Sequence, residues 1–240
     1  MLCILGLMYK LFDHKKEFKE ALNISIPIMI GYLVLGFAFG LLASSFDLDW
    51  HIPILMSIFI YAGALQFLAI GFFNIKMGLI DIAIATIFVN IRQSFYGLSL
   101  LKKFKKTGKF KKYLIFGLTD ETYGLLTTVE ENKKLSKKYF YFFLTSLNQL
   151  YWITGTIFGT VFGATIKFDT NGLEFSLTAL FVVLCIEQYK RLQNILPFII
   201  GGIASIIAFL VVPSDKMLIT AILVSLLLLL TFKQRIENDK

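Results

Sequence analysis

The third apolar stretch of this chain carries a positive charge, in VNIRQSFYG (89–97). An arginine at the centre of a lipid-facing helix costs about 2.5–3.5 kcal/mol on insertion scales. We therefore expect Arg92 to face the protein interior or water, or to lie close enough to the helix end to reach the headgroups. In the first case its guanidinium can bind a substrate carboxylate bidentately, with Asn90 fixing the orientation. In the second case Arg92 only anchors the helix.

Two adjacent acids, Asp120 and Glu121, occupy the centre of the next segment, within TDET (119–122). Neighbouring residues on a helix point about 100° apart, so the two carboxylates need not serve one purpose. A carboxylate held away from water can carry a coupling proton or receive an ammonium group. The alternative is a structural ion pair with Arg92 or with a lysine.

Three further clusters could contribute polar groups. Tyr61, Gly63 and Gln66 lie mid-span within YAGALQF, where a polar side chain and exposed backbone can converge on a ligand. Glu187 ends a later apolar stretch and is either a second coupling acid or an interfacial residue. The cysteines and histidines show no metal-ligand spacing, and no motif for a nucleophile with its base occurs. We therefore expect no metal, no cofactor and no enzymatic activity.

The elements that position these residues are expected to be membrane-spanning helices. Mean hydropathy is +0.73 and 57% of residues are hydrophobic. A hydrocarbon core about 30 Å thick needs about 20 apolar residues in a helix. The candidate spans are 22–45, 53–73, 78–101, 113–129, 140–166, 173–189, 195–212 and 215–233. The chain is thus predicted to be an all-α polytopic membrane protein, with about seven transmembrane helices and a shorter polar fourth segment.

The fourth segment is bounded by lysine-rich stretches at 102–112 and 133–138. If both stretches are cytoplasmic, the segment is re-entrant; otherwise it crosses the membrane. The distribution of Lys and Arg favours a re-entrant segment with an external N-terminus. The lysine cluster at 10–19 instead favours an internal N-terminus, so the orientation stays open. The formal charge of +8 lies almost entirely between the apolar runs, which indicates contact with anionic lipid and not with nucleic acid.

An internal repeat is also predicted. GFAFG (36–40) corresponds to GTVFG (159–163), and LDWHIPIL corresponds to LEFSLTAL further along. The two three-helix units are antiparallel if the fourth segment does not cross, and parallel if it does. The GxxxG spacing in both motifs indicates close helix packing. These elements form a single permease domain over 1–240, with an interfacial N-terminal segment at 1–21 and candidate repeat units at 22–101 and 140–212.

Five motifs in order resemble the AzlC family over about residues 20–235: IPIMIGYLVLGFAFGLLA, LMSIFIYAGALQF, FVNIRQSFYGLSL, LTDETYGLL and LEFSLTALFVVLCIEQ. The resemblance implies a bacterial inner-membrane permease that exports branched-chain amino acids with a small hydrophobic AzlD-type subunit, driven by an ion gradient. In one departure, Gln93 stands where the family leads us to expect histidine. Glutamine cannot titrate, so any proton relay would fall to Asp120, Glu121 or Glu187.

We therefore expect a secondary transporter for small apolar amino acids. Arg92, Asn90 and Gln66 are expected to form the carboxylate and polar shell, and Asp120 or Glu121 to receive the ammonium or the proton. A channel or passive assembly subunit is the first alternative. An intramembrane enzyme using the two acids is the second, although adjacent acids in one short element suit that chemistry poorly.

Overall fold

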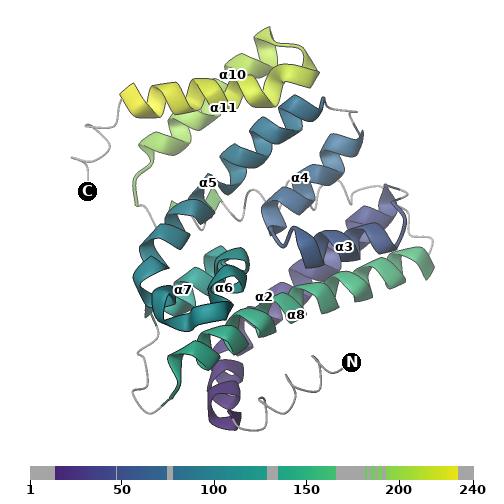
Figure 1. Ribbon diagram of the computed structural model, residues 1–240. Helices are drawn as coiled ribbons and strands as arrows, with labels where there is room; N and C mark the ends of the chain where they lie inside the picture. The colour runs from purple at the N-terminus through teal and green to yellow at the C-terminus, as the bar shows by residue number, and fades with distance from the viewer. Residues whose placement is uncertain are drawn as a thin grey trace. The chain divides into compact units, whose positions relative to one another are not determined.

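The computed structural model describes residues 14–46, 48–74, 78–128, 135–165 and 193–231, with residues 182, 185, 186, 189 and 190. Within these ranges the regular structure is helical throughout, which confirms the all-α prediction (Figure 1). The helices are α2 (Lys15–Ser45), α3 (His51–Phe59), α4 (Gly63–Asn74), α5 (Leu79–Phe104), the 3₁₀ helix η1 (Lys105–Phe110), α6 (Lys111–Phe116), α7 (Asp120–Thr128), α8 (Lys137–Thr165), α10 (Leu196–Val211) and α11 (Ser214–Thr231).

The described residues form two compact units. The first holds the described residues up to 66 and those from 90 to 165, and the second holds the others. The site described below lies entirely in the first unit. In the second, α10 and α11 pack against each other, with the small side chains of Ala204, Ala208 and Ala221 buried.

Most predicted spans correspond to single helices, with ends that differ by a few residues. Among the described residues, α2 and the bent stretch Leu79–Phe116 are long and apolar enough to cross a membrane. Helix α8 has 29 residues and is therefore about 43 Å long. The predicted spans 53–73 and 113–129 each consist of two short helices separated by a turn. The predicted span 173–189 lies largely outside the described residues.

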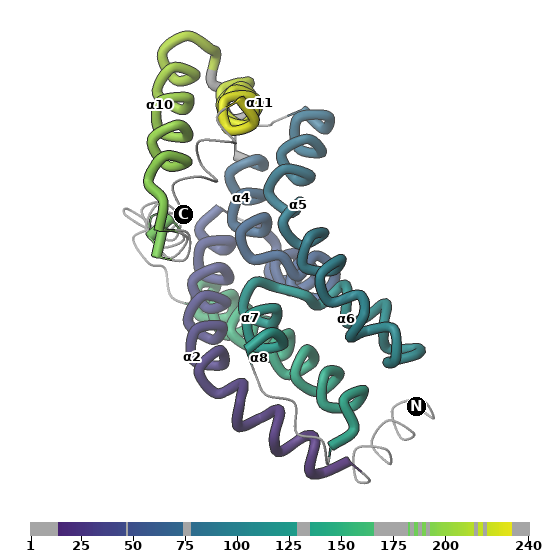
Figure 2. The backbone as a smooth tube through the Cα atoms, turned by 90° about the vertical axis from the view of Figure 1, so that its left-hand side faces the viewer, coloured from purple at the N-terminus to yellow at the C-terminus, as the bar shows by residue number. Residues whose placement is uncertain are grey.

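Helices α2 and α8 pack side by side along their glycine faces (Figure 2). A Cβ atom at Gly36 would lie 2.6 Å from the carbonyl oxygen of Trp152, and one at Gly155 would lie 2.6 Å from that of Leu33. Backbones can approach this closely only where side chains are absent, which is the packing that the GxxxG spacing predicts.

The two long helices run in the same direction. Near their N-terminal ends, the backbone N–H of Ser136 donates to Oε1 of Glu17 (3.0 Å). Near their C-terminal ends, Oγ of Ser44 donates to the carbonyl oxygen of Thr160 (3.3 Å). The helices that open the two predicted repeat units are therefore parallel. The expectation of antiparallel units for a fourth segment that turns back is wrong for these two helices, because the predicted second span turns back as well.

The predicted second span folds back on itself at residues 60–62. Tyr61, in this turn, has a φ of +44°, a conformation that costs a non-glycine residue energy and needs support from its surroundings. Gln66, in the first turn of α4, donates from Nε2 to Oγ of Ser57 on α3 (3.1 Å). Ser57 in turn shares a hydrogen bond with Thr156 of α8 (2.9 Å). Residues 51–66 thus form a first hairpin that approaches α8 from its C-terminal end.

The predicted fourth segment forms a second hairpin, with its turn at residues 117–119. The hydroxyl of Thr119 accepts the backbone N–H of Thr122 (3.2 Å) and so caps the start of α7. At the other end of α7, Nζ of Lys103 donates to the carbonyl oxygen of Leu126 (2.8 Å). The chain therefore leaves the end of α5, forms α6, turns, and returns along α7 to the same end of α5.

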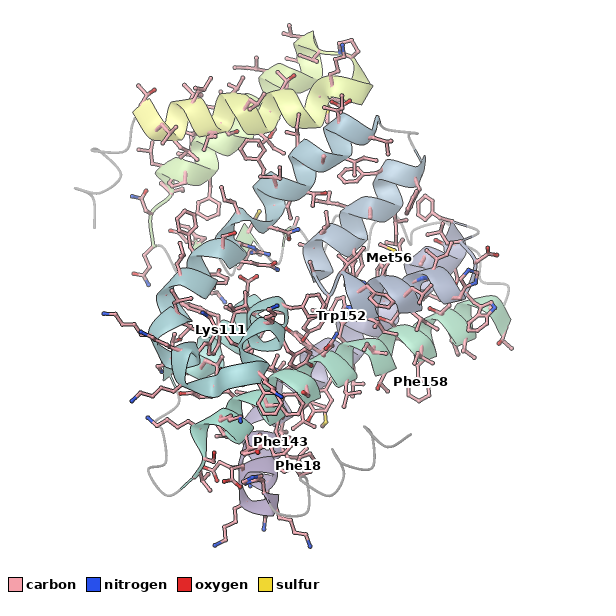
Figure 3. All side chains as sticks on the ribbon, viewed as in Figure 1. Phe18, Met56, Lys111, Phe143, Trp152 and Phe158 are labelled. Atoms are coloured by element: carbon pink, nitrogen blue, oxygen red, sulfur yellow. The ribbon has the colours of Figure 1, made fainter. Side chains whose placement is uncertain are left out.

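The lysine-rich segments gather at one end of the first unit. Lys138, at the start of α8, places its Nζ 5.1 Å from the ring centroid of Phe110 at the end of η1. The ring of His14, just before α2, stacks on Tyr139 at 3.6 Å. The starts of α2 and α8 and the η1 segment are thus neighbours, and Figure 3 shows Phe18 and Phe143 close together at this end.

The glycine interface predicts a specific packing defect. In the variant Gly159→Ala, the added methyl would overlap the carbonyl of Phe37, so α2 and α8 must separate. We expect a destabilisation of about 1–3 kcal/mol, seen as a lower melting temperature of the detergent-purified protein. Gly31→Ala is the matched control, because a Cβ there would have no heavy atom of the described residues within 4 Å apart from its neighbours in the backbone of α2. Equal melting temperatures for the two variants would contradict the close contact.

Candidate functional site

The turns of the two hairpins meet beside the middle of α8. The rings of Tyr61 in the first turn and Phe116 at the end of α6 lie 6.4 Å apart between centroids. Tyr32, halfway along α2, shares a 2.6 Å hydrogen bond with Thr119 in the second turn. Trp152 lies on α8 beside the first hairpin (Figure 3). Two interrupted helices and two long helices therefore converge on one region of the first unit.

Arg92 of α5 pairs with Asp120 at the first residue of α7. The distance from Nη2 to Oδ2 is 2.9 Å, and the two side chains are 39% and 31% exposed. One turn further along α5, the ring of Tyr96 stacks on Tyr123 at 4.3 Å between centroids. Arg92 and Tyr96 thus share the helix face that packs on α7, as their spacing predicts. In this state the guanidinium meets a carboxylate and lies within the first unit.

Glu121 points toward a different helix from its neighbour Asp120. The hydroxyl of Tyr32 on α2 donates to Oε2 of Glu121 (2.6 Å). Tyr32 itself is 4% exposed, and its ring packs edge-to-face on Trp152 at 5.6 Å. The two adjacent carboxylates therefore point apart, since one is held by the guanidinium of Arg92 and the other by the phenol of Tyr32.

A line of hydrogen bonds connects Glu121 to the buried part of α8. It continues from Tyr32 to Thr119 (2.6 Å), and from Thr119 to the hydroxyl of Thr122 (3.0 Å). The amide nitrogen of Asn148, a side chain with no exposed area, donates to the same Thr122 hydroxyl (2.9 Å). The second turn is thereby tied to both α2 and α8 through polar groups, which is unusual packing for an apolar environment.

Four buried oxygen atoms around this turn have no hydrogen-bond partner in the described structure. They are Oη of Tyr61, Oδ1 of Asp120, Oγ1 of Thr145 and Oδ1 of Asn148. Buried polar atoms in folded proteins are nearly always paired with protein, water or an ion. Their concentration beside one turn indicates that the site meets a polar or charged group.

Gln66 and Gly63 hold the first hairpin against α8. Oε1 of Gln66 accepts the indole N–H of Trp152 (3.1 Å), while its nitrogen donates to Ser57. A Cβ at Gly63 would lie 3.0 Å from the indole ring of Trp152. Both polar ends of the Gln66 amide are therefore engaged within the protein.

The remaining predicted residues are Asn90, Gln93 and Glu187. Asn90 and Gln93 are half-buried on α5, within one turn of Arg92. Glu187 lies outside the described residues. Among those described, no group of three or more His, Cys, Asp or Glu side chains could hold a metal ion.

Sequence reasoning missed five residues of this site, namely Tyr32, Thr119, Thr122, Thr145 and Asn148. Asn148 and Thr145 carried a usable signal, because polar side chains within the predicted span 140–166 are expected to face protein. Tyr32 carried no such signal, since a tyrosine within an apolar run commonly serves only in helix packing.

Comparison with known proteins finds relatives along most of the chain. The model of the family described as AzlC protein matches residues 27–166. The chain is 36% identical to a "Branched-chain amino acid transport protein AzlC" of Bacillus subtilis over 221 residues, covering 92% of this chain and 87% of that protein. It is 38% identical to an "Uncharacterized membrane protein" of Helicobacter pylori, covering 92% and 97%. It is 29% identical to "Inner membrane protein YgaZ" of Escherichia coli, covering 80% and 82%. No solved structure matches the chain.

Proposed function

The chain belongs to the AzlC family, and we propose that it is the large subunit of a secondary transporter that exports branched-chain amino acids. It is a multi-pass membrane protein with a role in transport. The observation that carries the finer proposal is the pair of differently held acids, Asp120 on Arg92 and Glu121 on Tyr32, beside the turns of two hairpins. Transporter sites commonly lie where helices are interrupted near the bilayer midplane.

A zwitterion can exchange with the Arg92–Asp120 pair without leaving a charge unmatched. The substrate carboxylate would bind the guanidinium of Arg92, and its ammonium would bind Asp120 or Glu121. Asn90 would orient the carboxylate from the same helix. Because helix N-termini carry partial positive charge, the starts of α4 and α7 at the two turns favour the carboxylate as well.

The remaining predicted residues have supporting parts in this proposal. Tyr61 offers a hydroxyl at the first turn, and Gln66 and Gly63 keep that turn against Trp152. Glu187 is retained as a further acid for coupling. The apolar side chain of leucine, isoleucine or valine would pack on the aromatic and aliphatic surfaces around the turns, since burial of apolar area favours such contacts.

We further propose that the lysine-rich end of the first unit faces the cytoplasm, as positive loops do. Helix α2 then starts inside, the first hairpin is re-entrant from outside, and the second is re-entrant from the cytoplasm. The crossing predicted at 53–73 would be replaced by a re-entrant hairpin, and the fourth segment, 113–129, would take the re-entrant alternative. The other crossings would be the predicted spans 78–101, 140–166, 173–189, 195–212 and 215–233.

This orientation predicts which sites an impermeant reagent reaches. Asp49 and Lys106 are exposed at opposite ends of the first unit. In a background with Cys3 and Cys185 replaced by serine, we expect a membrane-impermeant maleimide to label Asp49→Cys in intact cells. Lys106→Cys should be labelled only after permeabilisation. Labelling of Lys106→Cys in intact cells would reverse the proposed orientation.

The function is tested by co-expression with a small AzlD-type subunit in a strain that accumulates branched-chain amino acids. Cells are loaded with leucine-, isoleucine- or valine-containing dipeptides, and intracellular and external amino acids are measured over time. The proposal predicts faster efflux and lower accumulation than in cells with the empty vector. Unchanged accumulation and efflux with both subunits present in the membrane would reject the exporter role.

A further inference from the structure

We propose that the unpaired oxygens of Tyr61, Thr145 and Asn148, with the free oxygen of Asp120, form a binding site for a small monovalent cation. The cation is Na⁺ or the ammonium group of the amino acid, and the inference rests on the proposed transport function. It deepens that function because the positively charged ligand would be bound by oxygens of α8 and of the first turn, in addition to the acids of α7.

The chemistry of these atoms calls for a positive or hydrogen-donating partner. Oδ1 of Asn148 and Oδ1 of Asp120 can only accept hydrogen bonds, and neither has a donor in the described structure. The hydroxyls of Tyr61 and Thr145 can each turn a lone pair toward the same partner. Tyr61 is 3% exposed, and Thr145 and Asn148 have no exposed area, so their oxygens lie away from bulk water.

The four residues border one turn. Asn148 donates to Thr122, two residues after Asp120. Thr145 lies one turn earlier on the same face of α8, where its methyl group contacts Gly117. The ring of Tyr61 lies beside Phe116, at the start of the same turn. Tyr61 and the two α8 residues thus each contact the segment 116–122 that carries Asp120.

The charged side chains around residues 116–122 match a ligand with a single positive charge. Residues 116–122 carry two carboxylates, of which Asp120 is paired with the guanidinium of Arg92 and Glu121 accepts the Tyr32 hydroxyl, so one negative charge has no positive partner among these contacts. Calcium and magnesium sites need more carboxylate oxygen or retained water. The C-terminal ends of α3 and α6 also lie at the two turns, and their carbonyl ends carry partial negative charge. A monovalent cation is thus matched better than a divalent one.

Trp152 provides a built-in reporter for the test. Its indole contacts Tyr32 and the first hairpin, and the only other tryptophan, Trp50, is 64% exposed. The full chain with Trp50→Phe is purified in detergent, and Trp152 fluorescence is titrated with NaCl against KCl and choline chloride at constant ionic strength. Parallel titrations use leucine, 3-methylbutylamine, which has only the ammonium, and 4-methylpentanoate, which has only the carboxylate.

A saturable response to Na⁺ alone identifies the coupling ion, and a response to 3-methylbutylamine alone identifies the substrate ammonium. Competition between the two identifies one shared site. Any of these outcomes supports the proposal. No response to either cation overturns it and assigns the four oxygens to ordinary bound water.

The variants Thr145→Val and Thr145→Ser separate ligation from packing. Valine keeps the shape and removes the oxygen, so we expect the cation affinity to fall by roughly tenfold or more. Serine keeps the oxygen and should retain the response. Thr165→Val is the control on the same helix, since that hydroxyl is exposed and bonds only its own helix at Val161 (2.6 Å) among the described contacts. Asn148→Leu should repeat the effect of Thr145→Val.

Equal cation affinity in Thr145→Val and wild type would also overturn the site. If leucine efflux persists in cells while the cation response is absent, the inference fails and the proposed function stands. If wild-type cells show no leucine efflux, the proposed function itself fails, whatever the fluorescence shows.

Discussion

Arg92→Ala is expected to reduce leucine efflux by about 10- to 100-fold, the equivalent of one lost charge-assisted hydrogen-bonded contact. The guanidinium is the positive group that pairs with Asp120 in the described unit, and without it a substrate carboxylate would lose its partner. Asp120→Asn should have a similar effect, because the neutral amide cannot balance Arg92 or an ammonium. Efflux from dipeptide-loaded cells measures both, with membrane insertion checked by immunoblot. Ser94→Ala, exposed on the same helix, is the matched control.

The charge swap of Arg92→Asp with Asp120→Arg distinguishes a transport site from a structural ion pair. The swap restores the attraction, so insertion and melting temperature should return toward wild type. Efflux should stay low, because a substrate would meet its two charges in exchanged positions. Recovery of full efflux in the swapped protein would show that the pair serves only the fold.

Glu121→Gln is expected to lower net leucine efflux by about tenfold or more while leaving leucine exchange largely intact. The carboxylate is held by the Tyr32 hydroxyl, at the head of the hydrogen-bond line that leads to Asn148. Glutamine keeps the shape but cannot take up or release a proton, so a coupled step would stop while exchange of leucine for leucine would continue. Net efflux and exchange are measured with the same labelled amino acid.

Two further variants test whether the ionisable group of Glu121 or its hydrogen bond to Tyr32 matters for net efflux. Tyr32→Phe removes the donor and keeps the ring against Trp152, so it should weaken net efflux by less than Glu121→Gln. Glu121→Asp keeps the ionisable group and should retain partial net efflux. Wild-type net efflux in Glu121→Gln would remove this acid from coupling and leave Asp120 or Glu187.

The apolar segments were predictable because the length of an apolar run is a local property. The length of the apolar run and the charges at its ends were enough to predict the helices at 22–45, 78–101 and 140–166. The first hairpin was not predictable in that way. The apolar run continues through Tyr61, and the chain turns there because Gln66 is held by Ser57 and Trp152, which are contacts between distant residues.

In the candidate site, too, the residues with a local signal were predictable and their partners on other helices were not. Arg92, Asp120 and Glu121 were visible because charged residues in apolar segments are costly and rare. Their partners were not assigned by sequence, since Tyr32 lies on another helix 89 residues from Glu121. The two adjacent acids could be expected to point apart, but only the fold shows that one meets α5 and the other meets α2.

Leucine counterflow in proteoliposomes tests the central claim most directly. The purified chain, reconstituted with its AzlD-type subunit and loaded with unlabelled leucine, is diluted into a trace of labelled leucine. We expect a transient accumulation of label above the external concentration, lost in Arg92→Ala and retained in Ser94→Ala. Label that only equilibrates, or accumulation that is the same in Arg92→Ala, would contradict a carrier site built around Arg92 and the two acids.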